Sequence, residues 1–373
     1  MFYILITTLF FDLTQFLNRH RALFIGLLSF AVLSVVFAYI PLYTTPEDTL
    51  IYQLYYTHPD WISGFEPGYV LFMNIVRSTG ISYWTFRWII AVIGFLFFCL
   101  GLSKFRVNVA SFVFLYALIP FLEDTIQLRN FLMASISFYA ISFLIDKSVK
   151  NVLIATVLIV VASSFQTLGL FGLVIIFVRV FDSKKGFRMA FFAITCLLTI
   201  LFAVPSIRSG LVNGLVMPFV NLLGRGQHIQ SFVLRMRPGT ITIVDIAANI
   251  SLVLIVYTAK RLIENGSDVS SKTVTISELI FDVTIAITLA MPMYFMAYNF
   301  DRILKNAFSF FFIFVLLFSR VMWKRSLSSF FIWNLAIILL CSLYAVAYYT
   351  YGTRLDQVVI PVLFQNTFLE VYR

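Results

Sequence analysis

The sequence predicts an all-α protein that crosses a membrane many times, and three observations lead to that fold class. Of the 373 residues, 61% are hydrophobic and only 12% are charged, with a mean hydropathy of +0.96. A soluble domain is about 45–50% apolar and about 25% charged, so this chain has too few charges to cover a surface in water. Long apolar runs recur along the chain, and basic residues gather in alternate connections. A soluble enzyme, a nucleic-acid-binding module and a disordered chain are excluded.

The spans follow from the lengths of the apolar runs. A helix that crosses the hydrocarbon core needs about 20 mainly apolar residues. Such runs lie near 22–40, 83–102, 107–122, 126–146, 150–164, 167–181, 187–204, 242–260, 275–298, 302–320 and 327–349. The shorter run 2–17 carries Asp12 and is either a first span or an interfacial helix. The sequence therefore predicts eleven or twelve transmembrane helices in a single integral membrane domain over residues 1–373.

The orientation follows from the basic residues in the connections between these runs. They are Arg19/Arg21, Lys104/Arg106, Lys147/Lys150, Lys184/Lys185/Arg188, Lys260/Arg261/Lys272 and Arg320/Lys324/Arg325. By the positive-inside rule that side is the cytoplasm, which also explains the net charge of +10 without nucleic acid. The alternation holds only if 67–82 does not cross, so we predict a re-entrant or interfacial helix there. Loops near 41–66 and 205–240 are then periplasmic.

The first periplasmic loop has the composition of a sugar-binding surface. It carries four carboxylates, several aromatic side chains and no Lys or Arg. Carboxylates accept hydrogen bonds from sugar hydroxyls, and aromatic faces pack against sugar rings. Asp48 and Tyr52 lie four residues apart, as on one face of a helical turn, and Glu66 precedes Pro67-Gly68-Tyr69. A plain helix-N-terminal charge explains Glu66 equally well, and a solvated loop explains Asp48 equally well.

Three further polar elements interrupt apolar sequence on the same side. Gln127 and Arg129 lie at the start of the span 126–146. An ionisable group one turn inside a span is costly and indicates a functional role. For Arg129 the alternative is an ion pair with Glu123 or Asp124. The break at 163–167 contains Gln166. The turn at 298–302 contains Asp301 and Arg302, for which a local ion pair is the alternative.

The long loop near 205–240 contains four arginines and no lysine. Arginine binds phosphate and carboxylate in a planar, two-pronged geometry, so this choice of residue favours an anionic ligand over simple charge. Arg235 and Arg237 lie close to the start of the next span, at the depth of a lipid diphosphate. Contact with lipid headgroups is the alternative.

No motif predicts a metal, a redox centre or bound nucleotide. Cys99, Cys196 and Cys341 lie inside apolar runs, as small buried hydrophobes do. The three histidines are far apart in the sequence, so no zinc spacing exists, and neither a Walker motif nor a glycine-rich fingerprint occurs.

The order of these elements resembles a known family. The chain resembles the EpsG-like group of Wzy-type oligosaccharide repeat-unit polymerases. The resemblance lies in the order of five elements: Asp48 with Tyr52, Glu66-Pro67-Gly68-Tyr69, Gln127 with Arg129, a polar break, and Asp301-Arg302. These proteins build bacterial O-antigen, capsule or exopolysaccharide. The resemblance runs from about 44 to 320. Where that family often has His in the polar break, this chain has Gln166, which cannot act as a base.

The resemblance implies an enzyme of the inner membrane with its active site at the periplasmic face, on a plan similar to GT-C glycosyltransferases. A glycan on undecaprenyl diphosphate would be transferred to a new lipid-linked repeat unit, with neither a nucleotide sugar nor a metal or other cofactor. Membrane lipid surrounds such a protein, and a chain-length regulator protein is a further expected partner.

The demands of that reaction assign roles to the candidate residues. Arg129 stabilises the leaving diphosphate, and Glu66 is ranked first and Asp48 second as the carboxylate that accepts the proton. The residues expected to bind diphosphate or glycan are Arg302, Arg235, Arg237, Tyr52, Tyr69, Gln127, Gln166 and Asp301.

Two other functions remain open at this point. The first is a glycosyltransferase that adds one sugar from a polyprenyl-phosphate donor, for which Glu47 and Asp48 would be the acidic pair. The second is a flippase for lipid-linked oligosaccharide, which would be expected to carry charges near mid-membrane and internal repeats.

Overall fold

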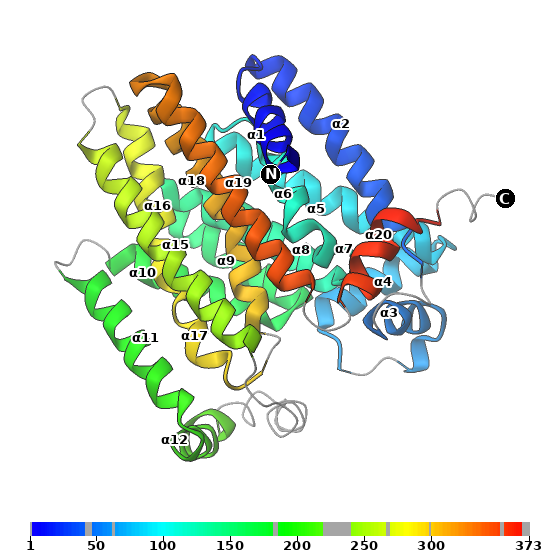
Figure 1. The fold of residues 1–373 in the computed structure, drawn as a ribbon. Coiled ribbons are helices and arrows are strands. Elements are labelled where there is room, and N and C mark those ends of the chain that lie inside the picture. The colour runs from blue at the N-terminus through cyan, green and yellow to red at the C-terminus, as the bar shows by residue number, and fades with distance from the viewer. Residues whose placement is uncertain are drawn as a thin grey trace.

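The computed structural model describes residues 2–367 apart from 42–46, 62–63, 182–185, 219–239, 266–268, 298–299 and 351–353, and this described part is helical without strands (Figure 1). The α-helices are α1 (Phe2–Gln15), α2 (Arg19–Ala38), α3 (Glu47–Thr57), α4 (Pro67–Ser78), α5 (Tyr83–Phe105), α6 (Val109–Leu118), α7 (Pro120–Ile126), α8 (Leu128–Ser142), α9 (Val149–Phe165), α10 (Phe171–Phe181), α11 (Phe187–Ala203), α12 (Pro205–Leu211), α15 (Thr240–Glu264), α16 (Ser271–Ile287), α17 (Ala290–Met293), α18 (Asp301–Arg325), α19 (Leu327–Tyr349) and α20 (Ile360–Phe364). Single turns of 3-10 or π helix are η1 (Pro59–Trp61), η2 (Phe143–Ile145), η3 (Thr167–Leu170), η4 (Val212–Val216) and η6 (Leu355–Val359).

The helices confirm a polytopic membrane protein. Within the described residues, seven helices are long and apolar enough to cross a membrane, and nine are if two bent pairs each count as one span. The sequence predicts eleven or twelve. The difference comes mainly from α9 and from η3 with α10, which coincide with the predicted spans 150–164 and 167–181 but form apolar helices of fewer than 18 residues.

Two prolines bend predicted spans. Pro120 separates α6 from α7 with a bend of 68°, and Pro205 separates α11 from α12 with a bend of 111°. Proline has no N–H to continue a helix and disfavours helical geometry in the residue before it, so each helix ends and a new one begins. The predicted span 107–122 is therefore broken, and α7 leads directly into α8.

The two predicted periplasmic loops contain more helix than expected. Most of 41–66 forms α3 and η1. Tyr52 and Tyr56 lie four residues apart on one face of α3, and both side chains are buried, so packing of this face stabilises the helix. The segment 205–216 forms α12 and η4, while 219–239 lies outside the described residues. The predicted helix near 67–82 is present as α4, whose 12 residues extend about 18 Å. Because hydrocarbon is about 30 Å thick, α4 cannot span it.

The core that positions the site is formed by α8, α16 and α18. In α18, 83% of the most apolar window is buried, against 28% in α19, which is peripheral. Helices α5 and α8 approach closely because Gly94 and Gly101 of α5 face Phe131 and Phe138 of α8. A Cβ atom at either glycine would lie 2.2 or 2.6 Å from the facing ring. Such small residues allow close helix contact without a hydrophobic driving force between helices.

The ends of the bundle differ. Helices α3, α4, α12 and α17 lie at one end, which we call the α3/α4 end, and the connections from α1 to α2 and from α18 to α19 lie at the other, which we call the opposite end (Figure 1).

Candidate active site

An ion pair between Glu66 and Arg129 forms the centre of the site at the α3/α4 end. Glu66 lies just before α4, and Arg129 lies in the first turn of α8; a guanidinium Nη1 contacts Oε2 of the carboxylate. The other carboxylate oxygen, Oε1, accepts hydrogen bonds from the backbone N–H and the hydroxyl of Thr167, both 3.0 Å long. The residue before α4, the first turn of α8 and the start of η3 thus meet at one buried carboxylate.

Aromatic rings surround the guanidinium of Arg129. It lies 4.1 Å from the ring centre of Phe65, and its Nε donates to the hydroxyl of Tyr52 at 3.2 Å. Tyr69 packs against both rings, with centroid distances of 5.9 Å to Tyr52 and 5.5 Å to Phe65. A cation on an aromatic face is stabilised electrostatically and held in one plane. The Arg129 side chain is 19% exposed, so it is not closed off completely from solvent.

Tyr69 contributes a buried hydroxyl to this centre. Its side chain is fully buried, and its hydroxyl has no hydrogen-bond partner among the described residues. Burial raises the pKa of Tyr69 well above its usual value, so the hydroxyl stays protonated at neutral pH. A donor in that state can bind a ligand oxygen.

Helix α3 connects Arg129 to a second arginine. Asp48 and Tyr52 occupy one face of α3, as predicted; Tyr52 accepts from Arg129, and Asp48 Oδ2 lies 3.8 Å from Nη2 of Arg302. The Asp48 side chain is 51% exposed and that of Arg302 is 13% exposed. The Asp48 carboxylate is thus half exposed beside Arg302, one helical turn from the tyrosine that binds Arg129.

A second, more buried charged group centres on Lys305 of α18. Its Nζ lies 3.1 Å from Asp301 and 3.6 Å from Glu123. Asp301 is also 3.7 Å from Nη2 of Arg354 and accepts a hydrogen bond of 3.4 Å from Tyr348. This arrangement replaces the expected alternative of a local Asp301–Arg302 pair, because the two side chains contact different partners.

The acidic pair before α8 does not bind Arg129. Glu123 accepts a hydrogen bond from Gln127 at 2.9 Å, and Asp124 accepts one from the hydroxyl of Tyr116 at 2.5 Å. The bend at Pro120 turns both carboxylates into the bundle, where they are buried. Gln127 therefore contacts Glu123 of the second charged group, whereas Arg129 pairs with Glu66.

Gln166 is the residue before Thr167 and ends α9. It is buried, and its side-chain oxygen has no hydrogen-bond partner among the described residues. Arg235 and Arg237 lie outside the described residues, so their predicted contacts stay predictions.

Arg87 is a residue of the site's scaffold that the sequence reasoning missed. It is fully buried near the start of α5 and donates to the carbonyls of Phe37, Ala38 and Thr125 at 2.7, 2.9 and 2.6 Å. These carbonyls end α2 and lie in the last turns of α7, so one side chain ties the two helices to α5. The sequence also does not identify Arg354 and Thr167 as partners; a signal for Arg354 is its position shortly after the last predicted span.

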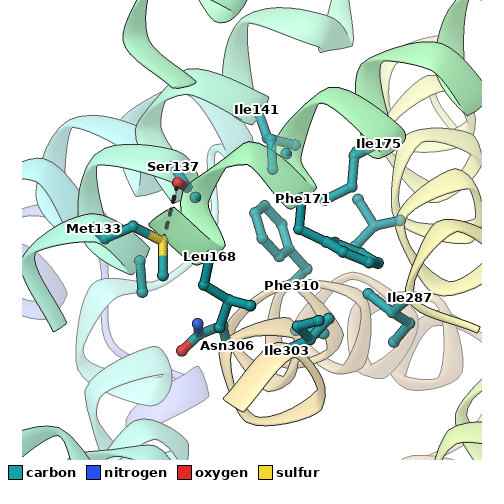
Figure 2. Close-up of a pocket in the computed structure, with 15 residues that line it drawn as sticks. Met133, Ser137, Ile141, Leu168, Phe171, Ile175, Ile287, Ile303, Asn306 and Phe310 are labelled. Atoms are coloured by element: carbon teal, nitrogen blue, oxygen red, sulfur yellow. Dashed lines mark hydrogen bonds between the residues drawn. The ribbon is translucent and has the colours of Figure 1, made fainter. Parts of the chain in front are cut away.

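An apolar pocket of about 50 Å³ lies beside Thr167, between α8, α10, α16 and α18 (Figure 2). Leu168, Phe171, Ile303 and Phe310 point into it. At its rim Asn306 of α18 and Asn130 of α8 exchange two hydrogen bonds, each 3.1 Å long. The charged site thus continues into a hydrocarbon-like environment.

The comparisons with known proteins give one match. The model of the EpsG family matches residues 22–362, nearly the whole described chain. Neither a curated protein nor a solved structure matches. The matched range contains α2 to η6 and every charged residue of the site described above. The chain therefore belongs to the EpsG family, a family of polysaccharide-polymerase type, and is a multi-pass helical membrane protein.

Proposed function

We propose that the protein polymerises oligosaccharide repeat units carried on undecaprenyl diphosphate. A hydroxyl of the incoming lipid-linked unit attacks the first sugar of the growing glycan. A new glycosidic bond forms, the bond to the diphosphate oxygen breaks, the hydroxyl proton passes to a carboxylate and undecaprenyl diphosphate leaves. The family supports the general activity, and the residues of the site support its details.

The observation that carries this proposal is the pair of arginines joined by α3. Arg129 and Arg302 contact Tyr52 and Asp48, which are one helical turn apart on α3. Negative charge develops on the diphosphate as the sugar leaves, and cations already fixed in place stabilise that charge without reorganising. The ion pair with Glu66 and the ring of Phe65 fix the plane of the Arg129 guanidinium.

A polymerase of this kind binds two lipid-linked substrates, and the charged residues form two groups. The first contains Arg129, whose partner Glu66 binds Thr167, the residue before Leu168 of the apolar pocket. The second contains Lys305 and Arg354, which lie 4.5 and 3.8 Å from the ring centre of Tyr348. Tyr348 stacks on Tyr344, and Tyr344 lines an apolar groove of about 290 Å³ between α15, α18 and α19.

We infer that each group holds the diphosphate of one substrate, with its hydrocarbon tail against the neighbouring apolar surface. The groove beside Tyr344 is lined by Phe308, Phe311 and small aliphatic residues, which suits an isoprenoid chain. The shared helices α8 and α18 keep the two groups at a fixed separation, because Asn130 and Asn306 bind each other.

The two carboxylates of the centre fit different roles. Glu66 is 4% exposed and has both oxygens bound, which fits a residue that positions Arg129. Asp48 is half exposed, so a sugar hydroxyl can reach it, which fits the proton acceptor. This reverses the order in which the sequence ranks them.

The experiment that separates these roles is polymerisation of purified lipid-linked repeat units across pH. Asp48→Asn should abolish turnover at every pH, whereas Glu66→Gln should lower turnover and leave the shape of the pH profile unchanged. Asp60→Asn, a change at another exposed carboxylate of the same segment, serves as the control. Loss of the acid limb of the profile in Glu66→Gln alone would return the role of base to Glu66.

A deletion strain tests the function itself. Loss of a polymerase leaves single repeat units on the cell surface. Full-length chains that lack one sugar would instead identify a single-sugar transferase, and lipid-linked units trapped inside the cell would identify a flippase.

The periplasmic location of the site is part of the proposal. The basic residues of alternate connections support it. Reporter tags at residues 185 and 268 should report the cytoplasm, and tags near 58, near 225 and at the C-terminus should report the periplasm. A cytoplasmic signal from the tag near 58 would contradict the location.

A further inference from the structure

A second cavity, of about 540 Å³, lies at the opposite end of the bundle from the Glu66–Arg129 pair. It is enclosed by the end of α1, the beginning of α2, the end of α5, the beginning of α6 and one residue of α18. Its volume is about ten times that of the pocket in Figure 2. Nothing in the proposed polymerisation uses it.

Three arginines from three separate segments line this cavity. They are Arg19 at the start of α2, Arg106 just after α5 and Arg320 near the end of α18. No carboxylate is among its described lining residues. The carboxylate of α1, Asp12, accepts a hydrogen bond of 2.5 Å from Asn334 instead. The cavity therefore has an uncompensated positive charge.

The local backbone holds two of these arginines together. Arg106 ends α5 with a φ of 57°, and it is the one non-glycine residue of the described chain with a positive φ. Residues with a Cβ atom rarely adopt that conformation, and they persist in it where surrounding contacts impose it. One such contact is visible, since Nη1 of Arg320 donates to the carbonyl of Arg106 at 3.0 Å.

Other donors add to the positive potential. Helices α2 and α6, of 20 and 10 residues, both begin beside the cavity, and a helix N-terminus carries partial positive charge. The side-chain amide nitrogen of Gln15, which also lines the cavity, is buried without a hydrogen-bond partner among the described residues.

One wall of the cavity is apolar. It consists of Ala22 and Leu23 of α2 with Cys99 and Leu102 of α5. Leu23 is 44% exposed, so this wall continues onto the lipid-facing surface of the bundle. A ligand that fits has an anionic head with several acceptor oxygens and a hydrocarbon chain.

We infer that this cavity binds the phosphate of an anionic phospholipid, with Arg19, Arg106 and Arg320 on the phosphate and an acyl chain along Leu23 and Leu102. Arginine is suited to phosphate because its planar donors match two oxygens at once. The inference is independent of the reaction at the α3/α4 end.

The test is native mass spectrometry of the full chain in a neutral detergent, titrated with phosphatidylglycerol, with phosphatidylcholine and with inorganic phosphate. Wild type should bind one phosphatidylglycerol more tightly than phosphatidylcholine. Arg106→Gln and Arg320→Gln should each weaken phosphatidylglycerol binding about tenfold, as expected for loss of a charge-assisted hydrogen bond. Arg21→Gln, on the same turn of α2 but outside the cavity lining, should change it less than about twofold.

Three outcomes would overturn the inference. Equal losses from Arg21→Gln and Arg106→Gln would indicate diffuse attraction to a basic surface. Equal affinity for both lipids would remove the phosphate headgroup as the determinant. Inorganic phosphate that binds as tightly as the lipid would assign the cavity to a free anion. If Arg320→Gln fails to fold, Arg19→Gln at an exposed side chain gives the same test.

Discussion

Two buried carboxylates in the described part of the chain accept hydrogen bonds from arginine side chains, Glu66 inside the candidate active site and Asp282 outside it. Asp282 of α16 is fully buried between Arg179 and Arg188, with contacts of 2.8 and 2.5 Å, and Arg179 itself is 1% exposed. Glu66 is buried as well, and its partner Arg129 also donates to Tyr52, which lies one helical turn from the half-exposed Asp48 on α3.

The difference between these groups lies in what surrounds the arginine. Both carboxylates have both oxygens occupied, so burial and pairing do not distinguish them. Each group has one partly exposed arginine, since the side chain of Arg188 is 20% exposed and that of Arg129 is 19% exposed. The second arginine on Asp282, Arg179, is 1% exposed and also donates to the carbonyl of Leu144 at 3.1 Å. Exposure of an arginine therefore does not separate the two groups either; the Glu66 group differs in its contact with Tyr52 of α3, a helix that also carries the half-exposed Asp48 beside Arg302.

Replacement of Asp282 should have the largest effect on folding. Asp282→Ala leaves two arginines inside the bundle without their shared carboxylate, and breaking a buried pair in this way costs about 3–5 kcal/mol. Thermal unfolding in detergent should show a correspondingly large loss of stability. Asp60→Ala, at an exposed carboxylate, should leave the unfolding temperature unchanged. If both variants unfold alike, the Asp282 group is not structural.

Replacement of Arg129 should have the opposite pattern of effects, a large loss of activity with little loss of stability. Arg129→Lys keeps the charge but loses the planar fork, so polymerisation should fall about 100-fold, the typical effect of losing one oxyanion donor. The unfolding temperature should stay close to that of wild type. Arg261→Lys, at an exposed arginine far along the chain, is the matched control. Ladders of wild-type length from Arg129→Lys would remove this residue from the site.

The second charged group should give an intermediate effect. Arg354→Gln removes one of the two cations near Asp301, so we expect polymerisation to fall about tenfold, through weaker substrate binding. A rise in KM with little change in kcat would agree with binding of one substrate diphosphate. An unchanged KM would separate this group from the substrate.

Tyr69→Phe should produce the smallest change. The Tyr69 hydroxyl is buried without a described partner, so its removal should leave stability within about 1 kcal/mol or raise it slightly. Activity should fall severalfold if the hydroxyl donates to a glycan oxygen, and because the raised pKa keeps it protonated, that contribution should persist through mildly alkaline pH. Identical activity of both proteins would limit Tyr69 to packing.

The sequence predicts the fold class and the helix positions well because lipid imposes simple requirements of length and hydropathy. It also predicts that Asp48 and Tyr52 share one face of a helix, and it selects Glu66 and Arg129 as candidate catalytic residues. It does not predict that Glu66 and Arg129 bind each other, since 63 residues separate them in the chain. That contact depends on how α4 packs against α8.

Other contacts were not predictable for local reasons. Glu123 lies close to Arg129 in sequence, and the simple expectation of a pair fails because Pro120 redirects the short helix α7, which carries Glu123. The sequence places Lys305 one turn after Asp301, but it does not show that Lys305 also contacts Glu123, 182 residues earlier in the chain. Three-dimensional packing, not local pattern, decides which carboxylate receives which cation.

The three hydrogen bonds of Arg87 also have a consequence for how the chain enters the membrane. A lone arginine inside a spanning segment opposes insertion by about 2.5–3.5 kcal/mol at the helix centre and by less near its end. The carbonyls of Phe37 and Ala38 belong to α2, which is synthesised before α5, so two acceptors are already present when Arg87 arrives. Helices α2 and α5 are therefore expected to leave the insertion machinery as a pair, and the later arrival of Thr125 adds α7 to a hairpin that already exists.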